Sequence, residues 1–551
     1  MIYMSTGGGG GGGVKLFIRE STGLVRELSF WDQLIIALGI INITGGFVLT
    51  MIVAPFAFPG SNMIWVFVLG AIPSFVIAWV YAILASAIPR TGGDYTWTGR
   101  VLGPRWASIL GWMYILGTAG AVATQAWYIT NFTLAQLFFN LGTRLNNSTY
   151  LTWSTIVSTS PGGFIIGLVV TIITALAGIF SLRIVKAILR YSIIIYAITF
   201  ILFLVGFAYV TPSSFIKAFD TIMSKYGVTY SSIMSVIKSN PAIASTSNIA
   251  ATLMAAIPMG FITYSGFNYG TYLAGETRRP VEAFPRALFV SVVITLVGLA
   301  LLSGLSYWAF GGAFLGGLSY LFNTGKLSAL PVEPTPNLFI GFVAPLWLVV
   351  LIDINLILGF WLVALTYTLT MPRILFAMGF DRLLPEGITK VSERFHSPYY
   401  SMLVFIVINA VYLAAIWYWG FMVTFLNTSL AMPVAWMIPG FTALLFPFLR
   451  RDIYEKVKPY LPNWMTRRVL GLPSISWGGI LLAAIWLADI AFMLVPISSY
   501  VYLGTSIPLA VGVVLVVAAG AVIYYEVRRW YLRRKYGIDL LPLTFREIPP
   551  E

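Results

Sequence analysis

Residues 39–50 read GIINITGGFVLT, and residues 257–270 read IPMGFITYSGFNYG. Both lie in the middle of long apolar stretches, and both are interrupted by small residues: Thr44, Gly45 and Gly46 in the first, and Gly260, Ser265 and Gly266 in the second. Two apolar segments interrupted at corresponding positions are typical of transporters that bind substrate near the membrane midplane, between two inverted repeats. The two stretches therefore predict two broken transmembrane helices.

The composition supports a membrane protein. The chain has 551 residues, of which 59% are hydrophobic and 9% are charged, whereas soluble domains carry about 25% charged residues. This excludes a soluble enzyme, a disordered chain and a nucleic-acid-binding domain. There is no cysteine and only one histidine, which excludes disulfides, cysteine nucleophiles and histidine-cluster metal sites.

Twelve stretches are long and apolar enough to cross a bilayer, which takes about 20 residues. The predicted spans are 33–57, 63–88, 106–138, 163–181, 188–211, 250–274, 285–310, 338–370, 399–419, 422–448, 474–496 and 503–527. The interrupted stretches fall in spans one and six, five spans apart, as a five-plus-five repeat requires. We therefore expect an all-α integral membrane protein with two five-helix repeats and two further helices.

Seven segments follow from these spans. They are a cytoplasmic N-terminal segment (1–32) with a flexible glycine run, a first repeat (33–211), an extracellular loop (212–249), a second repeat (250–448), a cytoplasmic loop (449–473), helices eleven and twelve (474–527) and a cytoplasmic tail (528–551). The long loops on the outer side are expected to form a cap over the helices.

The loop charges predict the orientation. With the N-terminus inside, 28 of the 33 Lys and Arg residues fall in inner segments and five in outer loops, as the positive-inside rule requires. The net charge of +14 then reflects contact with an anionic inner leaflet rather than with nucleic acid. We expect a multi-pass protein of the plasma membrane with both termini in the cytoplasm.

The interruptions suggest what is transported. An unwound segment exposes amide and carbonyl groups that cannot stay unpaired in lipid. Free amides at a helix N-terminus attract a carboxylate, and free carbonyls, mainly in span six, attract an ammonium group. Together they suit a zwitterionic amino acid, and neither interruption contains a charged side chain. The alternative is that the small residues only allow close helix packing.

Three ordered motifs resemble one known family, the amino acid–polyamine–organocation permeases, over essentially the whole chain. They are YAILASAIPRTGGDYTW (81–97), ITYSGFNYGTYLAGETRRPVEAFPRAL (262–288) and PRILFAMGFDRLLPEGITKVSERFHSP (372–398). One departure is Ile83, where the family usually has Glu. The resemblance implies the leucine-transporter fold and secondary transport of amino acids or related amines.

The resemblance also implies site residues. Thr44 and Gly45 match the pair that binds the substrate carboxylate, with Ile41 and Gly46 beside them. Ser265 and Gly266 match the backbone that meets the amino group, and Phe267 and Asn268 match pocket-lining side chains. The aromatic gate of the family falls on Ile262, with Phe261 adjacent.

Ion coupling is open on the sequence. Some family members use a lysine in span five, but the corresponding residue here is Tyr196. Thr366, Thr368 and Thr370 in span eight are candidate sodium ligands, and exchange without an ion is the other possibility. No cofactor and no metal centre is expected, because a proton or sodium gradient or exchange would drive transport.

Three further residues are isolated polar groups. Asp353 lies 20 residues before Arg373, or about 30 Å along a helix, which predicts a hydrated position at the outer mouth. Asp489 lies in span eleven, outside the repeats. For both acids a structural hydrogen bond is expected rather than a transport role, and His396 is expected on the cytoplasmic surface.

The leading hypothesis is a neutral, apolar amino acid as substrate. A transporter of polyamines or cationic amino acids would need acids facing the pocket, and spans one, three and six supply none. A sensor with little flux is a further alternative, and a membrane enzyme is disfavoured because no nucleophile–base pair is evident. The oligomeric state is left open.

Overall fold

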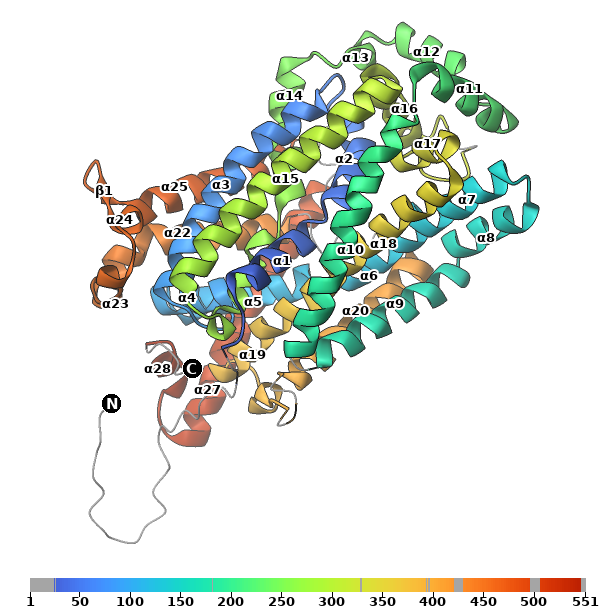
Figure 1. The fold of residues 1–551 in the computed structure, drawn as a ribbon. Coiled ribbons are helices and arrows are strands. Elements are labelled where there is room, and N and C mark those ends of the chain that lie inside the picture. The colour runs from blue at the N-terminus through green and yellow to red at the C-terminus, as the bar shows by residue number, and fades with distance from the viewer. Residues whose placement is uncertain are drawn as a thin grey trace, which may run out of the picture.

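The computed structural model describes residues 24, 26–180, 182–327, 330–392, 394, 397–420, 430–495 and 506–546. Within these ranges the chain is almost entirely helical, and the one sheet is a short antiparallel pair, β1 (Arg468–Val469) and β2 (Leu472–Pro473). Long helices run side by side through the body of the molecule, as Figure 1 shows.

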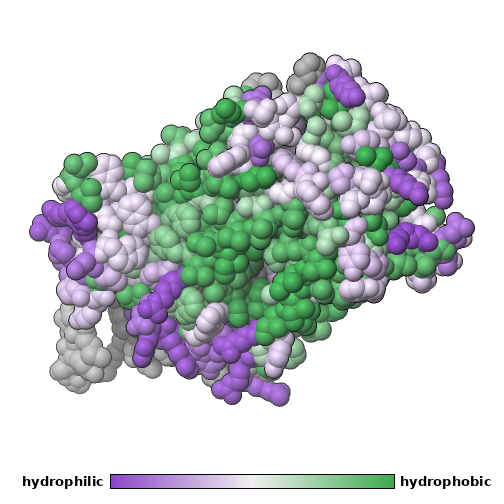
Figure 2. Space-filling view, turned by 45° about the horizontal axis from the view of Figure 1, so that its top comes forward, coloured by the Kyte–Doolittle hydropathy of each residue, from purple (hydrophilic) through white to green (hydrophobic). Residues whose placement is uncertain are grey.

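Helices of the described residues correspond in order to the twelve predicted spans, but only ten of them, or eleven with a bent pair, are long and apolar enough to cross a membrane. The bent pair supplies span four, and a shorter apolar stretch at 249–264 supplies the first part of span six. A broad hydrophobic band crosses the molecule, with hydrophilic residues on either side of it (Figure 2). Such a band is what the acyl chains of a bilayer require.

The first repeat contains ten α-helices and the π-helical turn η1 (Ile129–Leu134). The α-helices are α1 (Phe30–Ile41), α2 (Ile43–Ala57), α3 (Met63–Ala87), α4 (Gly93–Val101), α5 (Pro104–Gly117), α6 (Ala121–Tyr128), α7 (Ala135–Arg144), α8 (Ser148–Ser158), α9 (Gly162–Ile179) and α10 (Leu182–Ala208).

A loop with α11 (Pro212–Met223), η2 (Ser224–Tyr226), α12 (Tyr230–Ser239) and α13 (Pro241–Ala244) joins the repeats. The second repeat contains α14 (Ile249–Ala255), η3 (Ala256–Phe261), η4 (Ile262–Tyr264), η5 (Phe267–Tyr272), η6 (Ala274–Glu276), α15 (Pro280–Phe310), α16 (Gly312–Asn323), α17 (Pro336–Val343), α18 (Leu346–Thr370), α19 (Pro372–Phe380), η7 (Glu386–Thr389), α20 (Tyr399–Trp419) and α22 (Ala431–Leu449).

The remaining elements are α23 (Arg451–Val457), η8 (Lys458–Tyr460), α24 (Asn463–Thr466), α25 (Ser474–Met493), α27 (Ile507–Tyr536) and α28 (Leu540–Thr544). Helices α25 and α27 are spans eleven and twelve. The predicted starts of spans ten and twelve, at 422 and 503, and His396 lie outside the described residues.

Helix contacts support a five-span repeat, because a contact between two spans recurs between the two spans five positions away in the chain. Span five (α10) packs on span eight (α18), and five spans later span ten (α22) packs on span three (α5). Span one (α1) likewise packs on span seven (α15), while span six (η3) packs on span two (α3). Spans one and six are therefore surrounded by equivalent neighbours.

The two ends of the bundle differ. We call the end that carries residues 26–32, 183–190 and 273–278 the basic end, and the opposite end, which carries α11–α13, α16 and α17, the cap end (Figure 1). At the cap end the Ile52 carbonyl of α2 accepts hydrogen bonds from Ser319 and Asn323 of α16. The loop helices thus hold the outer half of span one.

Candidate substrate site

Span one is broken at a single residue, Asn42, between α1 and α2. Asn42 has φ 49°, a left-handed conformation that asparagine tolerates better than most residues. Its side-chain oxygen accepts the Gly45 amide at 3.1 Å, so the same residue caps the next helix. Span one was expected to break at Thr44–Gly46, and this position is wrong: Gly45 and Gly46 lie in the first turn of α2.

Tyr196 of α10 completes the polar cluster at this break. Its hydroxyl oxygen accepts the Thr44 amide at 3.1 Å and lies 3.1 Å from the Thr44 hydroxyl. Asn355 of α18 donates to the Tyr196 carbonyl at 2.8 Å. The amides of Thr44 and Gly45 are therefore bound by the chain's own groups, and an incoming carboxylate must displace the Tyr196 hydroxyl and the Asn42 side chain to reach them.

The break in span six extends over many residues. The π-helical turn η3 is followed by η4, a bend at Ser265 (φ −58°, ψ 149°), Gly266 with φ 94°, and the 3₁₀-helical η5. Only glycine adopts such a φ without a steric cost. Gly266, as expected from the sequence, is a point where the helix is interrupted.

The two breaks touch each other. A Cβ atom on Gly46 would lie 2.8 Å from Thr263 Cγ2, and one on Gly266 would lie 3.2 Å from Ile40 Cδ1. The hydroxyls of Thr50 and Thr263 are 2.8 Å apart. The structure thus brings together two sequence segments more than 200 residues apart, through glycines that leave no room for a side chain.

The other predicted site residues surround this contact. Ile41 is the buried last residue of α1, and Asn268 lies beside the Tyr81 hydroxyl of α3. Phe261 is fully buried and its ring packs on Trp486 of α25 at 4.9 Å, while Ile262 starts η4 and Phe267 is buried. The substrate and gating roles of these residues stay predictions.

The three threonines of span eight are not equivalent. Thr368 and Thr370 donate to carbonyls one turn earlier in α18, at 2.9 and 2.7 Å. The Thr366 hydroxyl is buried and has no hydrogen-bond partner among the described residues, and a Cβ atom on Gly39 of α1 would lie 3.3 Å from it. Among these threonines, Thr366 is the one whose hydroxyl faces span one, and its ion-coupling role remains a prediction.

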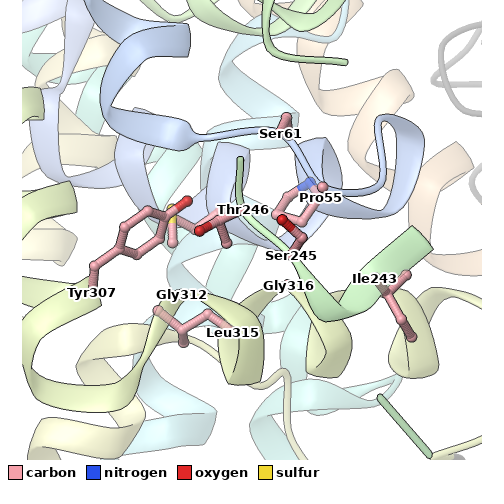
Figure 3. A pocket seen from close by; sticks show the side chains of 11 residues that line it. Pro55, Ser61, Ile243, Ser245, Thr246, Tyr307, Gly312, Leu315 and Gly316 are labelled. Atoms are coloured by element: carbon pink, nitrogen blue, oxygen red, sulfur yellow. The ribbon is translucent and has the colours of Figure 1, made fainter. Parts of the chain in front are cut away.

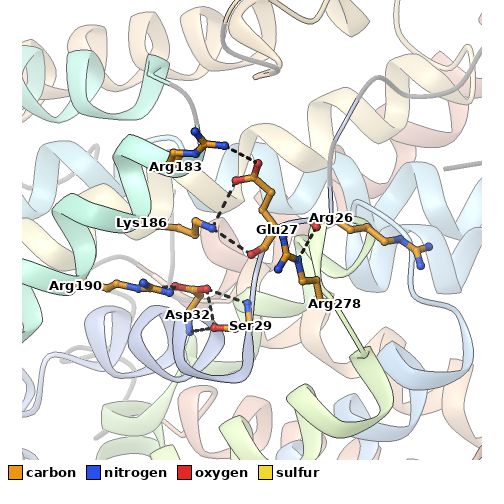
Figure 4. Close-up of polar contacts among 8 residues, drawn as sticks. All are labelled: Arg26, Glu27, Ser29, Asp32, Arg183, Lys186, Arg190 and Arg278. Atoms are coloured by element: carbon orange, nitrogen blue, oxygen red, sulfur yellow. Dashed lines mark hydrogen bonds and ion pairs between the residues drawn. The ribbon is translucent and has the colours of Figure 1, made fainter.

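Ion pairs close the basic end around span one. Asp32, at the start of α1, binds Arg190 of α10 at 2.7 Å, and Glu27 lies 3.5 Å from Lys186 (Figure 4). Arg278 donates to the Arg26 carbonyl at 3.0 Å. The segment before α1 is therefore attached both to span five and to the chain that follows span six.

Deeper at the same end, buried polar contacts join span six to its neighbours. Arg373 of α19 makes two hydrogen bonds to Glu276, at 3.0 and 3.2 Å, and Gln33 of α1 donates to Thr277 at 2.8 Å. Both members of the Arg373–Glu276 pair are almost fully buried. Breaking one partner of such a pair leaves an uncompensated charge, so opening this end requires these groups to gain water together.

One small cavity lies between the helices at the cap end. A cavity of ≈ 10 Å³ lies among α2, α15, α16 and the chain around Ser245 and Thr246 (Figure 3), room for about one water molecule. The Tyr307 hydroxyl accepts the Met63 amide at 2.9 Å beside it. The outer half of span one is thus closely covered at this point.

The two acids within apolar runs differ from expectation. Asp353 was expected to be hydrated, which is wrong, because Asn337 of α17 covers it and leaves it 2% exposed. The structural hydrogen bond expected for it is confirmed, since Asn337 donates to it at 3.3 Å. A structural hydrogen bond was expected for Asp489, but neither carboxylate oxygen has a hydrogen-bond partner in the described part of the chain. Its helix face packs instead on α22 and α3, whose sequences offer no charged residue.

Sequence reasoning missed Asn42. The available signal was a single amide side chain within an otherwise apolar turn, two residues before Thr44, and asparagine favours both left-handed and capping positions. The contact from Tyr196 has no local signal, because the two residues are 152 positions apart.

Comparisons with known proteins give the family of the chain. The family model described as "Amino acid permease" matches residues 28–524. The chain is 26% identical over 392 residues to the branched-chain amino acid permease BcaP of Bacillus subtilis, covering 70% of this chain and 74% of that protein.

Two further relatives carry different substrates in their names. The methylthioribose transporter of Bacillus subtilis is 26% identical over 388 residues, which cover 69% of this chain and 73% of that protein. Cationic amino acid transporter 4 of Mus musculus is 34% identical over 110 residues, which cover 19% of this chain and 17% of that protein.

Proposed function

Because the chain belongs to the amino acid permease family, we propose that it is a secondary transporter of a neutral amino acid with an apolar side chain. The observation that carries this proposal is the contact between the two breaks: amides, hydroxyls and carbonyls meet there with no charged side chain among Asn42, Thr44, Tyr196, Ser265 and Asn268. A zwitterion needs both donors and acceptors but no net charge opposite it. The name of the BcaP relative supports a branched aliphatic side chain.

Transport proceeds by alternating access. The substrate carboxylate replaces the Tyr196 hydroxyl and the Asn42 side chain at the amides of α2, and its ammonium group binds the carbonyls exposed around Ser265. Release requires the ion pairs at the basic end to separate. The protein works without a cofactor, driven by a proton gradient or by exchange, in the plasma membrane with both termini in the cytoplasm.

A cationic substrate is less well supported. It would need a carboxylate in the pocket, and both buried acids near the span-six break are already bound. Asp94 accepts hydrogen bonds from three tyrosine hydroxyls, and Glu276 is paired with Arg373. The match to a cationic amino acid transporter covers only 19% of this chain. These observations favour the neutral substrate.

The test is uptake by the purified protein in liposomes. Radiolabelled leucine, isoleucine and valine are offered with and without internal amino acids, a pH gradient or a sodium gradient. We expect saturable uptake that unlabelled branched-chain amino acids suppress and that lysine, spermidine and methylthioribose do not. Suppression by lysine or spermidine would favour the cationic alternative, and binding without flux would favour a sensor.

A selectivity variant sharpens this test. Asn268→Asp places a carboxylate at a predicted pocket position, so lysine should compete better than in the wild type. The matched control is Asn323→Asp at the cap end, where the side chain donates to the Ile52 and Ser319 carbonyls. An unchanged competition profile for Asn268→Asp would remove Asn268 from the pocket.

A further inference from the structure

Asp94 is a fully buried carboxylate on which three tyrosine hydroxyls converge. Tyr114, Tyr81 and Tyr272 donate to the same oxygen, Oδ2, at 2.7, 2.9 and 3.2 Å. Asp94 lies in the first turn of α4, outside the membrane-spanning helices. The three tyrosines come from span two, span three and the chain after the span-six break, so a single carboxylate holds these segments together.

In the part of the chain that the structure describes, no Lys or Arg forms an ion pair with this carboxylate. On α4 itself Arg100 binds Asp381 through two hydrogen bonds of 2.6 Å. On α19 Arg373 binds Glu276, and on α5 Arg105 binds Glu526 at the surface. Helix α22 supplies no charged residue, and the titratable residues of η5 are the tyrosines Tyr269 and Tyr272.

The remaining oxygen of Asp94 is a second, independent sign of an incomplete site. Within the described residues, Oδ1 receives no hydrogen bond from another side chain. A buried carboxylate with too few hydrogen bonds is less stable in its charged form than one in water. Burial raises the pKa of Asp94 to about 6, against the opposing effect of the three tyrosine hydrogen bonds. A proton on Oδ1 would make the group neutral and leave all three tyrosine hydrogen bonds on Oδ2 in place.

We propose that Asp94 is a proton-binding site that couples proton movement to opening of the basic end, an inference that rests on the proposed transport function. One proton binds the carboxylate to give a neutral carboxyl group, and no other bond is made or broken. Because the buried carboxylate has a higher pKa than one in water, a bound proton favours the closed basic end. Opening that end, which moves Tyr272 of span six away from Asp94, therefore releases the proton.

Tyr272 is placed to transmit this change. Its carbonyl accepts the Gly92 amide at 3.0 Å, and a Cβ atom on Gly93 would lie 2.1 Å from its ring. The chain after the span-six break is thus fastened directly to the start of α4. When this chain moves away, Asp94 meets water, its pKa returns toward the ordinary value of about 4, and the proton leaves at the basic end.

The substrate site is joined to Asp94 by one side chain. Asn268, a predicted pocket residue, lies beside the Tyr81 hydroxyl, and that hydroxyl donates to Asp94. Occupancy of the break and protonation of Asp94 therefore act on the same short segment, 267–272, from its two ends.

The experiment compares two modes of transport in liposomes. Leucine accumulation driven by an inside-alkaline pH gradient needs proton coupling, whereas leucine exchange at equal pH does not. We expect the wild type to do both, and Asp94→Asn to retain exchange while losing gradient-driven accumulation. Asp94→Glu should restore part of the accumulation, and Asp353→Asn, a second buried aspartate at the cap end, should retain both modes.

The pH profile separates coupling from a structural role. Tyr272→Phe removes one hydrogen bond that favours the charged form of Asp94, so the pKa of Asp94 rises. The midpoint of the pH dependence of gradient-driven accumulation should therefore move to higher pH, by up to about one unit. Tyr269→Phe is the matched control, because Tyr269 stacks on Tyr272 at 5.2 Å without a hydrogen bond to Asp94.

Several results would overturn the proposal. Gradient-driven leucine accumulation that survives in Asp94→Asn would do so. So would a pH midpoint of accumulation that is unchanged in Tyr272→Phe, even if Asp94→Asn had lost both accumulation and exchange. A wild type that exchanges leucine but ignores the pH gradient would overturn the proton site while leaving the proposed function intact. A wild type that moves no amino acid in either mode would overturn both.

Discussion

The breaks in spans one and six both interrupt a membrane helix, but they do so through different local structures. Span one leaves the α-helix at one residue, because Asn42 adopts the left-handed conformation and also caps the helix that follows. In span six, a π-helical turn, 3₁₀ turns and Gly266 occupy the chain from Ala256 to Glu276. A break that caps itself is short and rigid, whereas a break made of weak helical turns can change its hydrogen bonds.

This difference assigns different tasks to the two breaks. In the proposed function span one is the binding element, because Asn42 and Tyr196 hold the amides of Gly45 and Thr44 in place until a carboxylate replaces them. Span six carries the contacts that must change, to Asp94, Arg373 and Gln33 through residues 272–277. We therefore expect substitutions in span one to alter binding and those in span six to alter the opening of the basic end.

The largest effect is expected for Gly45→Leu, which should reduce leucine uptake to background. A Cβ atom there would lie 2.1 Å from Asn42 Nδ2 and 2.7 Å from Phe360 Cε1, and such overpacking costs about 1–3 kcal/mol. The larger residue therefore also lowers thermal stability. Gly304→Ala, where a Cβ atom meets nothing within 4 Å, is the control for both uptake and melting temperature.

Gly266→Ala should give the next largest effect and distinguish the two breaks. Alanine at φ 94° costs about 1–2 kcal/mol, and its Cβ would touch Ile40. Because the strain falls in span six, we expect the maximal rate to drop more than the affinity for leucine. A lowered affinity at an unchanged maximal rate would contradict the division of tasks between the two breaks.

Asn42→Ala should weaken span one in two ways. It removes the oxygen that accepts the Gly45 amide, and loss of such a cap costs about 0.5–2 kcal/mol. It also leaves alanine in a left-handed conformation. Asn42→Gly keeps the conformation accessible and loses only the cap, so its melting temperature should lie between those of Asn42→Ala and the wild type. Equal melting temperatures for all three proteins would show that the break does not depend on Asn42.

The smallest effect is expected for Tyr196→Phe. It removes the hydroxyl that binds the Thr44 amide, and a net hydrogen bond contributes about 0.5–1.5 kcal/mol. If the substrate carboxylate displaces this hydroxyl, leucine should bind more tightly in the variant while the protein becomes slightly less stable. Binding titration and thermal melting measure the two effects separately, and weaker leucine binding would show that Tyr196 assists the substrate rather than competes with it.

Most of the architecture could be predicted from the sequence, because apolar length is a local property. The all-helical fold, the ten or eleven spanning helices of the described residues and the interruption at Gly266 follow from runs of apolar residues and from glycine positions. The interruption in span one was predicted in the right helix but at Gly45 and Gly46 instead of Asn42. The glycines serve a different purpose there: they let α2 approach Phe360 and Thr263.

Tertiary structure alone decided which polar groups meet. Asp94 was visible in a motif, but its partners Tyr81, Tyr114 and Tyr272 lie 13, 20 and 178 residues away. Asp353 shows the same limit, since helix length placed it near the outer mouth while α17 buried it. Spans are set by the free energy of placing apolar side chains in lipid, residue by residue, whereas the charge state and the partners of a polar group depend on whatever the fold brings beside it.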